Sequence, residues 1–457
     1  MGGARNLLSA FRTGHRSLKL SKAIKNAREE GEEAVLSALA PWLNELESDI
    51  ETAGALIWSL DNGALKPDTV AEIFARILDA HGDDLAILIA LGDAIESARD
   101  IDDLNAPPSD NPLFADLLRR LSERQLRTSD PKEERDIVDA MATTARLMGR
   151  QKDETAERAY RRLVELDPET PYPHYGLGLY YKTRGRFAEG LAANQRAIEL
   201  AGDEASEAMK WNLGICATGA GEGHVALEVW RAMGNKLDIG HLDLPDGGYP
   251  ACKVRLAERP LAERGAESDC PGMEETIWVE RLSPCHGIVR SVLYQEDLGV
   301  DYGDTVLFDG APITYHRYGE NNVAVFPHLA TLAMGGFHYY PFAATQLEGG
   351  MVETVNDQIE GTALIYSHTE NCYTLCACCM AKGDTDHTHE RREHNVIQGR
   401  IAVSPEVTAA KALALIDTAY SKIEGAHLFA PDLAKAAGDD DRVRLETPRF
   451  LELSEED

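Results

Sequence analysis

The sequence lacks the features that would place the protein in a membrane or on a nucleic acid. Its most apolar stretch, Leu85 to Leu91, is far shorter than the ~18 residues that a membrane-spanning helix needs. Basic residues are scarce: 46 Lys and Arg stand against 77 Asp and Glu, giving a formal net charge of −31. Such a surface repels phosphate backbones and anionic headgroups. Nucleic acid and membrane are therefore not expected as partners, except through residues 1–28.

Signals for secretion, lipidation and nucleotide binding are also missing. The N-terminus has no apolar core followed by a small-residue cleavage site. Asn6 stands where a myristoylation signal has Ser or Thr. We find no phosphate-binding loop, dinucleotide fingerprint or kinase signature. These absences predict a cytoplasmic protein and reveal no substrate.

Cysteine is nearly absent from the first half of the chain and crowded in the second. Of eight cysteines, only Cys216 precedes residue 250, and four fall within 372–379. In a long chain without a secretion signal, such clustering is typical of metal binding or reactive thiols rather than of a disulfide framework. A reducing compartment is the expected setting.

The N-terminal residues 1–28 reverse the charge of the rest of the chain. They carry seven Lys or Arg and no acid, with several leucines interleaved. A basic amphipathic helix of this kind can seek an anionic membrane, a nucleic acid or an acidic groove. It can equally dock by its leucines onto the acidic body and leave its cations in solvent. The sequence leaves both interpretations open.

Residues 29–236 have helical periodicity and contain an internal repeat. Ala156, Tyr160 and Leu163 on one helix are echoed 70 residues later, and each set is associated with a Leu-Gly pair on a neighbouring helix. The echoing residues are Ala226, Trp230 and Met233, and the pairs are Leu177-Gly178 and Leu213-Gly214. Small residues set against large apolar ones at fixed offsets indicate helix pairs that stack closely.

This pattern resembles the tetratricopeptide repeat over roughly residues 137–236. Gly190 and Asn194 depart from it, standing where the family prefers Ala and an aromatic residue. The resemblance implies a helical solenoid whose concave face binds a protein or peptide partner. It places six residues on that face: Met141, Tyr175, Leu179, Lys182, Trp211 and Ile215. These side chains can bind a partner helix or the protein's own C-terminal domain, or be covered by neighbouring repeats.

Beyond residue 236 the pattern changes to short β-type runs separated by turns. Residues 237–275 have the composition of a linker, and 276–425 carry several strands at close spacing, which favours a small barrel or curled sheet. Within this region we also expect helices over Thr345–Ile359 and Glu406–Ile423 and a strand over Ala363–Ser367. Residues 426–457 read as an acidic, solvated tail. The predicted fold class is a multidomain α+β protein: a helical solenoid followed by a β-rich domain with a Cys/His cluster.

The densest group of metal-binding residue types lies between His368 and His394. Cys376 and Cys379 have the two-residue gap that lets two thiolates face one ion. Nitrogen ligands can come from three histidines, His387, His389 and His394. The spacing predicts a structural zinc site.

Three catalytic patterns fit the same residues incompletely. A zinc-protease helix needs its second histidine at position 393, and His394 is one place late. His387-Thr388-His389 resembles the motif of a metallo-β-lactamase-like hydrolase but lacks its downstream Asp and His. A thioredoxin-like redox site would need Cys376–Cys379 in a βαβ context, which this region does not show.

Cys285-His286 is a second candidate for catalysis. It pairs a thiol with an imidazole, although neighbouring residues on a strand point to opposite faces. A buried structural cysteine is the competing interpretation.

Two functions follow from these observations. The first is a cytoplasmic scaffold or adaptor, in which tetratricopeptide-like repeats bind a partner and zinc stabilises the β-rich domain. The second is a metal- or thiol-dependent enzyme of hydrolase type in the C-terminal domain, with the helices recruiting its substrate. The coordination of the metal separates them, because a structural site is closed by four protein ligands whereas a catalytic site keeps one position open.

Overall fold

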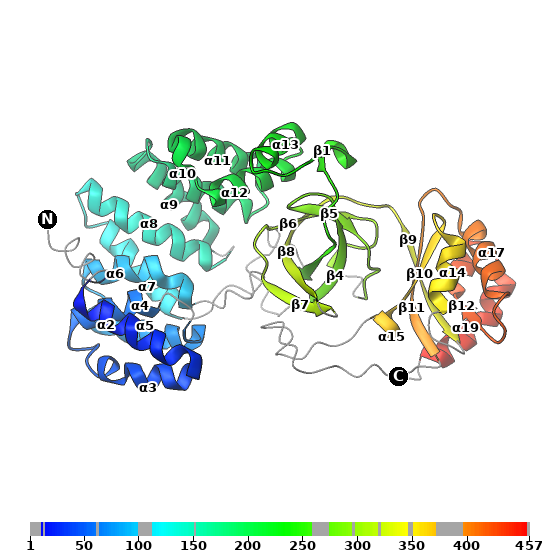
Figure 1. The fold of residues 1–457 in the computed structure, drawn as a ribbon, viewed down its shortest axis with the longest axis horizontal. Coiled ribbons are helices and arrows are strands. Elements are labelled where there is room, and N and C mark those ends of the chain that lie inside the picture. Colours follow the sequence, from blue (N-terminus) through cyan, green and yellow to red (C-terminus); the bar gives the residue numbers. More distant parts are fainter. Residues whose placement is uncertain are drawn as a thin grey trace. The chain divides into compact units, whose positions relative to one another are not determined.

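The computed structural model describes residue 11 and residues 14–60, 64–98, 112–149, 152–257, 274–294, 298–318, 321–345, 351–371 and 396–454. These residues form two compact units, one ending at Ala220 and the other beginning at Gly221 (Figure 1). The first is entirely helical in its described part, and the second contains a six-stranded sheet, a four-stranded sheet and a small two-stranded sheet, together with helices. An N-terminal helical array and a β-rich C-terminal part are therefore both present, as the sequence predicts. In the described part of the chain, no helix is long and apolar enough to cross a membrane.

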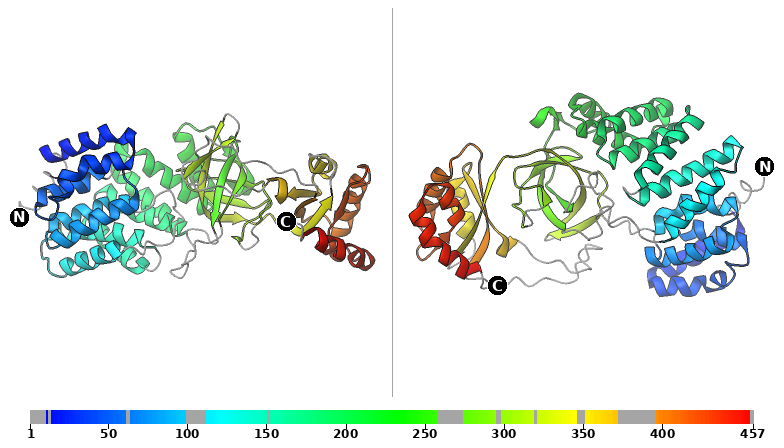
Figure 2. Two further views of the ribbon diagram at one scale, coloured as in Figure 1. Left: turned by 90° about the horizontal axis from the view of Figure 1, so that it is seen from below. Right: turned by 180° about the vertical axis from the view of Figure 1, so that it is seen from behind.

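The first unit is a series of antiparallel helices stacked side by side, as Figure 2 shows from two directions. One continuous hydrophobic core runs through it from Phe11 to Tyr181. Its α-helices are α2 (His15–Ala27), α3 (Glu32–Leu43), α4 (Ile50–Leu60), α5 (Pro67–His81), α6 (Leu85–Ala94), α7 (Pro112–Gln125), α8 (Pro131–Leu147), α9 (Asp153–Leu166), α10 (Pro171–Lys182), α11 (Phe187–Ala201) and α12 (Glu207–Gly219).

Local sequence fixes where several of these helices begin. Pro131 occupies the first turn of α8, and the Asp130 side chain accepts a hydrogen bond from the Lys132 N–H at 3.0 Å. The Asp84 side chain caps α6 in the same way, through the Ala86 N–H at 2.8 Å. Both features satisfy or remove backbone donors that a helix start leaves without partners.

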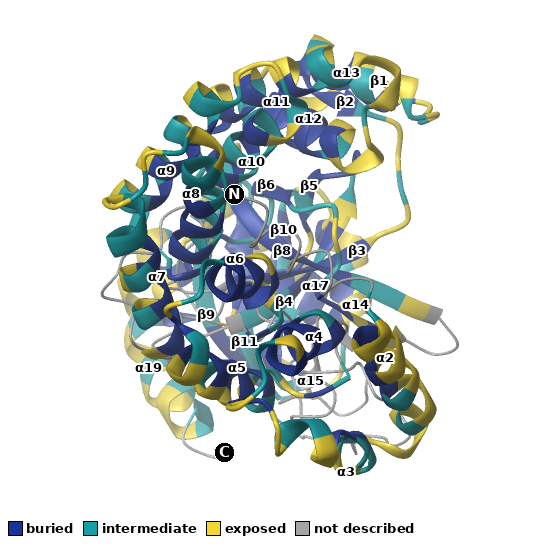
Figure 3. Ribbon diagram, turned by 90° about the vertical axis from the view of Figure 1, so that its left-hand side faces the viewer, coloured by how far each residue is buried: buried dark blue, intermediate teal, exposed yellow. Residues whose placement is uncertain are grey.

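Helix α6 lies at the centre of the N-terminal part of the array. It is apolar on all sides, and most of it is buried, as the dark blue ribbon in Figure 3 shows. A Cβ at Gly92 would come within 2.3 Å of the Ala140 Cβ on α8, so a glycine is needed for the two helices to approach this closely. A helix that is apolar all round is stable in water only when neighbours cover it.

Helix α2 shows how the basic N-terminus is used. Leu20 and Ile24 are buried, and the helix packs against α3 and α4. Three lysines on its other faces, Lys19, Lys22 and Lys25, are exposed. The described part of residues 1–28 therefore has the arrangement expected of a docked helix with solvated cations.

The second unit carries the remaining elements. Its helices are α13 (Gly223–Ala232), α14 (Met351–Ile359), α15 (His368–Asn371), α17 (Ala409–Tyr420), α18 (Pro431–Ala436) and α19 (Asp440–Ser454). Its strands are β1 (Asp238–Ile239), β2 (Pro245–Asp246), β3 (Cys252–Ala257), β4 (Glu274–Arg281), β5 (His286–Val289), β6 (Thr305–Phe308), β7 (Thr314–Tyr318), β8 (Asn321–Ala333), β9 (His338–Thr345), β10 (Ala363–Ser367), β11 (Val396–Val403) and β12 (His427–Phe429).

Six of these strands form a small barrel, which agrees with the barrel or curled sheet expected from the sequence. Strands β3-β4-β5-β6-β8 follow one another, a parallel pairing of β3 with β8 closes the ring, and β7 is added to β8. Alternation along β3 sends Val254 and Leu256 into the core and leaves Lys253 and Arg255 on the outer face. The core is filled by aliphatic residues and by the stacked rings of Phe308 and Phe326.

The other sheet is antiparallel, in the order β10-β11-β9-β12, with α14, α17, α18 and α19 on one face (Figure 1). Its outer strand β10 is closed off by a side chain from α14. The Asn356 amide donates to the Ile365 carbonyl and accepts from the Ile365 N–H, both at 2.8 Å. This side chain replaces a further strand at that position, which is one way to stop edge-to-edge pairing.

A buried ion pair joins this sheet to the barrel. Arg400 on β11 donates through Nη1 to Asp301 Oδ2 at 2.7 Å and to the Leu293 carbonyl at 3.0 Å. Its guanidinium lies 4.7 Å from the ring centre of Tyr339. His368 Nε2 lies 3.0 Å from the Val292 carbonyl nearby. Because Arg400 and Asp301 are both largely buried, each charge depends on the other for compensation.

Three stretches differ from the elements expected from the sequence. Strand β3 begins at Cys252, inside the range expected to be a linker, and Thr345 ends strand β9 instead of opening a helix. Residues 427–454 form β12, α18 and α19 instead of a solvated tail. Leu433 and Glu446 explain this last difference: the leucine is buried in the core, and the buried carboxylate accepts the Ala430 N–H at 2.9 Å.

Candidate partner-binding surfaces of the helical array

Helices α10, α11 and α12 stack closely because each contact between neighbours contains a small residue. A Cβ at Gly178 would lie 2.4 Å from the Asn194 amide nitrogen, and one at Gly190 would lie 2.8 Å from Cys216 Sγ. Asn194 donates to the Gly190 carbonyl at 2.8 Å. The two departures from the repeat pattern each fit a neighbouring helix: Asn194 is a compact polar side chain that faces Gly178 on α10, and Gly190 leaves room for Cys216 on α12.

Helix α10 presents a row of apolar and aromatic side chains. Tyr172, Tyr175 and Leu179 follow at the i, i+3, i+7 spacing that places residues on one helix face. Tyr172 is 71% exposed, and the other two are half-buried. A tyrosine exposed to this extent beside further apolar surface is a common feature of binding sites.

The six residues predicted for the concave face divide into two groups. Tyr175, Leu179 and Trp211 are half-buried and retain surface that can meet a partner. The other three, Met141, Lys182 and Ile215, are buried, with at most 7% of each residue exposed. Tyr172 was absent from the predicted set, although its position three residues before Tyr175 is the signal that would have found it.

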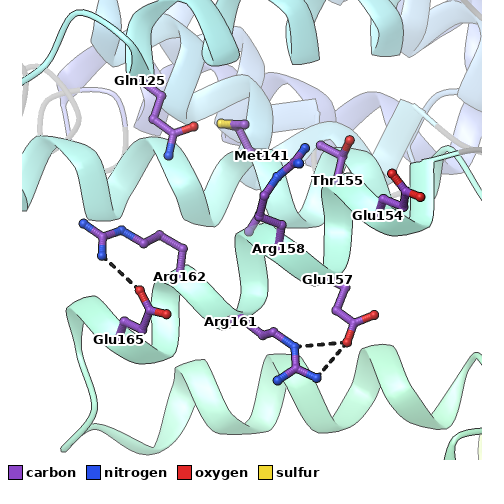
Figure 4. A pocket seen from close by; sticks show the side chains of 10 residues that line it. Gln125, Met141, Glu154, Thr155, Glu157, Arg158, Arg161, Arg162 and Glu165 are labelled. Atoms are coloured by element: carbon purple, nitrogen blue, oxygen red, sulfur yellow. Dashed lines mark hydrogen bonds and ion pairs between the residues drawn. The ribbon is translucent and has the colours of Figure 1, made fainter.

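A pocket of about 600 Å³ lies along α9 (Figure 4). Met141 on α8 and Ala159 on α9 supply apolar lining, and Gln125 at the end of α7 closes one end. The remaining lining comes from α9: Glu154, Thr155, Glu157, Arg158, Arg161, Arg162 and Glu165. A volume of this size can hold a few side chains of a peptide.

Most of the charges around this pocket are matched within the chain. Arg161 Nη2 lies 2.9 Å from Glu157, and Arg162 Nε lies 2.9 Å from Glu134 on α8. Hydrogen bonds from arginines hold the carboxyl pKa values below their usual range, chiefly through Arg186 for Glu157 and through Arg162 for Glu134. The pocket is therefore a polar-rimmed groove with little net charge.

The predicted zinc ligands Cys376, Cys379, His387, His389 and His394 lie outside the described residues. The described strands fix where that segment starts and ends, however. Strands β10 and β11 pair antiparallel, with Ser367 opposite Gly399, so residues 372–395 connect two neighbouring strands. Within the described residues, no three His, Cys, Asp or Glu side chains are grouped so that they could hold a metal.

Cys285 and His286 lie in the interior and do not form a dyad. Both are fully buried, and His286 Nδ1 lies 2.5 Å from the Ser283 hydroxyl. Burial lowers the pKa of His286 to about 4, which keeps the ring neutral. A catalytic thiol has to be accessible and electropositively placed. Cys285 is fully buried, so it is not accessible and packs as a structural residue.

Solved structures similar to this chain include MamA and a PilF protein from Pseudomonas aeruginosa, both of which contain tetratricopeptide repeats. The MamA structure is 16% identical with a TM-score of 0.26, and the match covers 36% of this chain and 79% of MamA. The PilF structure is 14% identical with a TM-score of 0.31, covering 50% of this chain and 92% of PilF. Both TM-scores are below 0.5, so the repeat assignment rests on the chain's own helix pairs. No protein-family model and no curated protein matches the sequence.

Proposed function

We propose that this protein is an interaction scaffold whose tetratricopeptide-like array binds a protein or peptide partner. The observation that carries the proposal is the row of Tyr172, Tyr175 and Leu179 on α10, which leaves a large aromatic side chain 71% exposed. Amphipathic helices bind apolar grooves through side chains at this spacing. Trp211 on α12 is half-buried and is proposed to contribute to the same surface, whereas Met141, Lys182 and Ile215 are buried and contribute to packing.

The proposal is tested by photo-cross-linking followed by an affinity measurement. A photoreactive amino acid at position 172 or 175 is expected to give a discrete adduct, whereas the same group at Tyr315 is not. Tyr315 is a suitable control because it is 50% exposed but lies on β7 of the barrel. With the partner purified, Tyr175→Ala should weaken binding by about tenfold, since truncating an aromatic anchor costs over 1 kcal/mol. Equal cross-linking at 172 and 315, or unchanged affinity, would contradict the proposal.

We further propose that a structural zinc ion stabilises the β-rich part. Its ligands would be Cys376, Cys379 and histidines among His387, His389 and His394. The ligand types and the Cys spacing support this assignment. The pairing of β10 with β11 supports it as well, because 24 residues connect strands that lie side by side. Ordering so long a connection costs conformational entropy, and binding of a metal within it would offset much of that cost.

Metal analysis tests the zinc site. Cys376→Ser combined with Cys379→Ser should abolish stoichiometric zinc in the purified protein, and the segment should become more sensitive to protease. Cys270→Ser should change neither property. Zinc retained at one per chain in the double variant would exclude these two thiolates as ligands.

A reducing cytoplasm is the compartment proposed for this protein. Support comes from three buried cysteines that form no disulfide, Cys216, Cys252 and Cys285. Burial raises the pKa of Cys252 to about 12, so that the thiol is inert at neutral pH. The location can be checked by fluorescence microscopy of the tagged full-length chain, and an extracytoplasmic signal would contradict it.

A further inference from the structure

Helix α2 presents an exposed face that the function proposed for the array does not use. Leu20 and Ile24 point into the core, and the helix contacts α3, α4 and the short helix η1 (Arg28–Glu30). Leu18, Lys22 and Lys25 follow one another at the i, i+4 and i+7 spacing that places residues on one helix face. All three are exposed, so this face points away from the core (Figure 3).

The cations of this face have no matching acids in the described structure. Lys19 lies beside the same face, and neither Lys19 nor Lys22 has an Asp or Glu one helical turn away in the sequence. Glu29 follows Lys25 by four residues, but the described residues show no ion pair between them. Arg16, in contrast, is paired with carboxylates at and just before the start of α4. The three lysines therefore remain available to an anionic partner.

Leu18 indicates which anionic partner fits. Its side chain is 64% exposed between the lysines. Helices at membrane surfaces combine these features, because lysines reach the headgroup phosphates while an apolar side chain enters the interface. A nucleic acid backbone would pair with the lysines but offer Leu18 no apolar surface. A peptide binds along a groove, whereas this face is the outer, convex side of a single helix.

We infer that this face of α2 docks on the surface of an anionic lipid bilayer, with Lys19, Lys22 and Lys25 at the headgroups and Leu18 inserted between them. Anionic lipids attract each lysine near the surface, and the contributions add. The acidic remainder of the chain does not prevent this contact, because salt screens charges that lie farther away than about 10 Å at 0.1 M ionic strength. The docked side of α2 stays in the array, so binding needs no unfolding of the helix.

The experiment measures co-flotation of the full-length chain with phosphatidylcholine vesicles, with and without phosphatidylserine. Binding is expected only to the vesicles that contain phosphatidylserine, and it should decrease as salt is added. Replacing Lys19, Lys22 and Lys25 together by Gln should weaken binding by about a hundredfold, since three attractive charges are lost. The matched control removes three exposed lysines elsewhere and should bind as the wild type does: Lys132→Gln, Lys210→Gln and Lys236→Gln.

A second variant separates insertion from charge attraction. Leu18→Ala keeps every charge and should weaken vesicle binding by about fivefold, because less apolar surface leaves water. Its melting temperature should equal that of the wild type, since the side chain is exposed. The inference is overturned if the triple lysine variant or Leu18→Ala binds as the wild type does, or if the control variant loses as much affinity. It is also overturned if vesicles without phosphatidylserine bind equally well, or if the chain binds polyglutamate or duplex DNA but no vesicle.

Discussion

The helical array and the barrel treat their cations in opposite ways. In the array, arginines of α9 have carboxylates one helical turn away or on the next helix, as in Arg161–Glu157 and Arg162–Glu134. On the barrel, Lys253 and His316 are buried without an acid among the described residues. The first arrangement is complete within the chain and suits a rigid framework. The second leaves the Nε2 atom of His316 buried without a hydrogen bond, which costs free energy.

Lowering the pH should reduce the unfolding free energy of the unit that contains the barrel by more than any of the single substitutions below. Burial lowers the pKa of three histidines, His286, His316 and His328, to about 4, against 6.5 in an ordinary setting. Between these values the unfolded chain binds protons that the folded chain does not, so stability is complete above about pH 6.5 and falls toward pH 4. We expect a loss of about 1–2 kcal/mol per histidine at pH 5, measured by urea unfolding.

His328→Leu should flatten this pH dependence, because His328 is buried on β8, where it pairs with Phe308 of the neighbouring strand β6, and its pKa is lowered by burial. His427→Leu is the matched control, since His427 is exposed on β12 and should leave the profile unchanged. A wild-type stability that does not change between pH 7 and pH 5 would show that these rings are not neutral and buried.

Breaking the buried Arg400–Asp301 ion pair between the barrel and the sheet that contains β11 should have the next largest effect. Arg400→Met leaves Asp301 buried without its partner, at an expected cost of about 3–5 kcal/mol in the free energy of unfolding. Adding Asp301→Asn should recover part of this loss, because the remaining charge is removed. A loss below about 1 kcal/mol for Arg400→Met would mean that water already solvates the pair.

Overpacking the array should cost somewhat less. Gly178→Leu pushes a side chain into Asn194, for an expected loss of about 1–3 kcal/mol or more. Asn194→Gly in the same chain makes room and should restore part of the melting temperature. If Gly178→Leu melts like the wild type, α10 and α11 do not pack as closely as the structure has them.

Removing an exposed ion pair of the array should change the unfolding free energy least. Arg161→Ala removes an exposed pair with Glu157, and we expect a change in unfolding free energy below about 0.5 kcal/mol, decreasing further in high salt. Together with Arg400→Met, this variant separates a pair that compensates a buried charge from one that water screens. A loss above about 2 kcal/mol would show that the Arg161–Glu157 pair is not screened by water and contributes to stability as a buried pair does.

The helices of the array, helix α17 and half of the strands could be predicted from periodicity, whereas the C-terminal helices α18 and α19 and the contacts across the chain could not. Strand β10 was predicted with its bounds, Ala363–Ser367, because turn residues flank a short apolar run. Strand β3 was missed, since its alternating Cys252-Lys253-Val254-Arg255 sits beside a stretch rich in Pro, Glu and Arg that resembles a linker. That alternation also places Lys253 and Arg255 on the face opposite the barrel core, but only the pairing with β7 through β8 shows that His316 shares this face.

The candidate sites show the same division. Tyr175, Leu179 and Trp211 were predicted from repeat positions, because a repeat encodes which residues face one side, and their role in binding a partner stays a prediction. Burial of Met141, Lys182 and Ile215 depends on neighbours that no single sequence position specifies. The Cys/His segment stays a prediction, since its ligands lie outside the described residues.

The place of β11 has a consequence for how the chain responds to cleavage. Because β11 lies between β10 and β9, everything after residue 395 is held by main-chain hydrogen bonds to strands that come earlier in the sequence. A single cut within 372–395 should therefore yield two fragments that separate in denaturing gels but elute as one species from a sizing column. The same topology makes this connection a place where new chain ends can be introduced, with the protein still assembling from two separately expressed pieces.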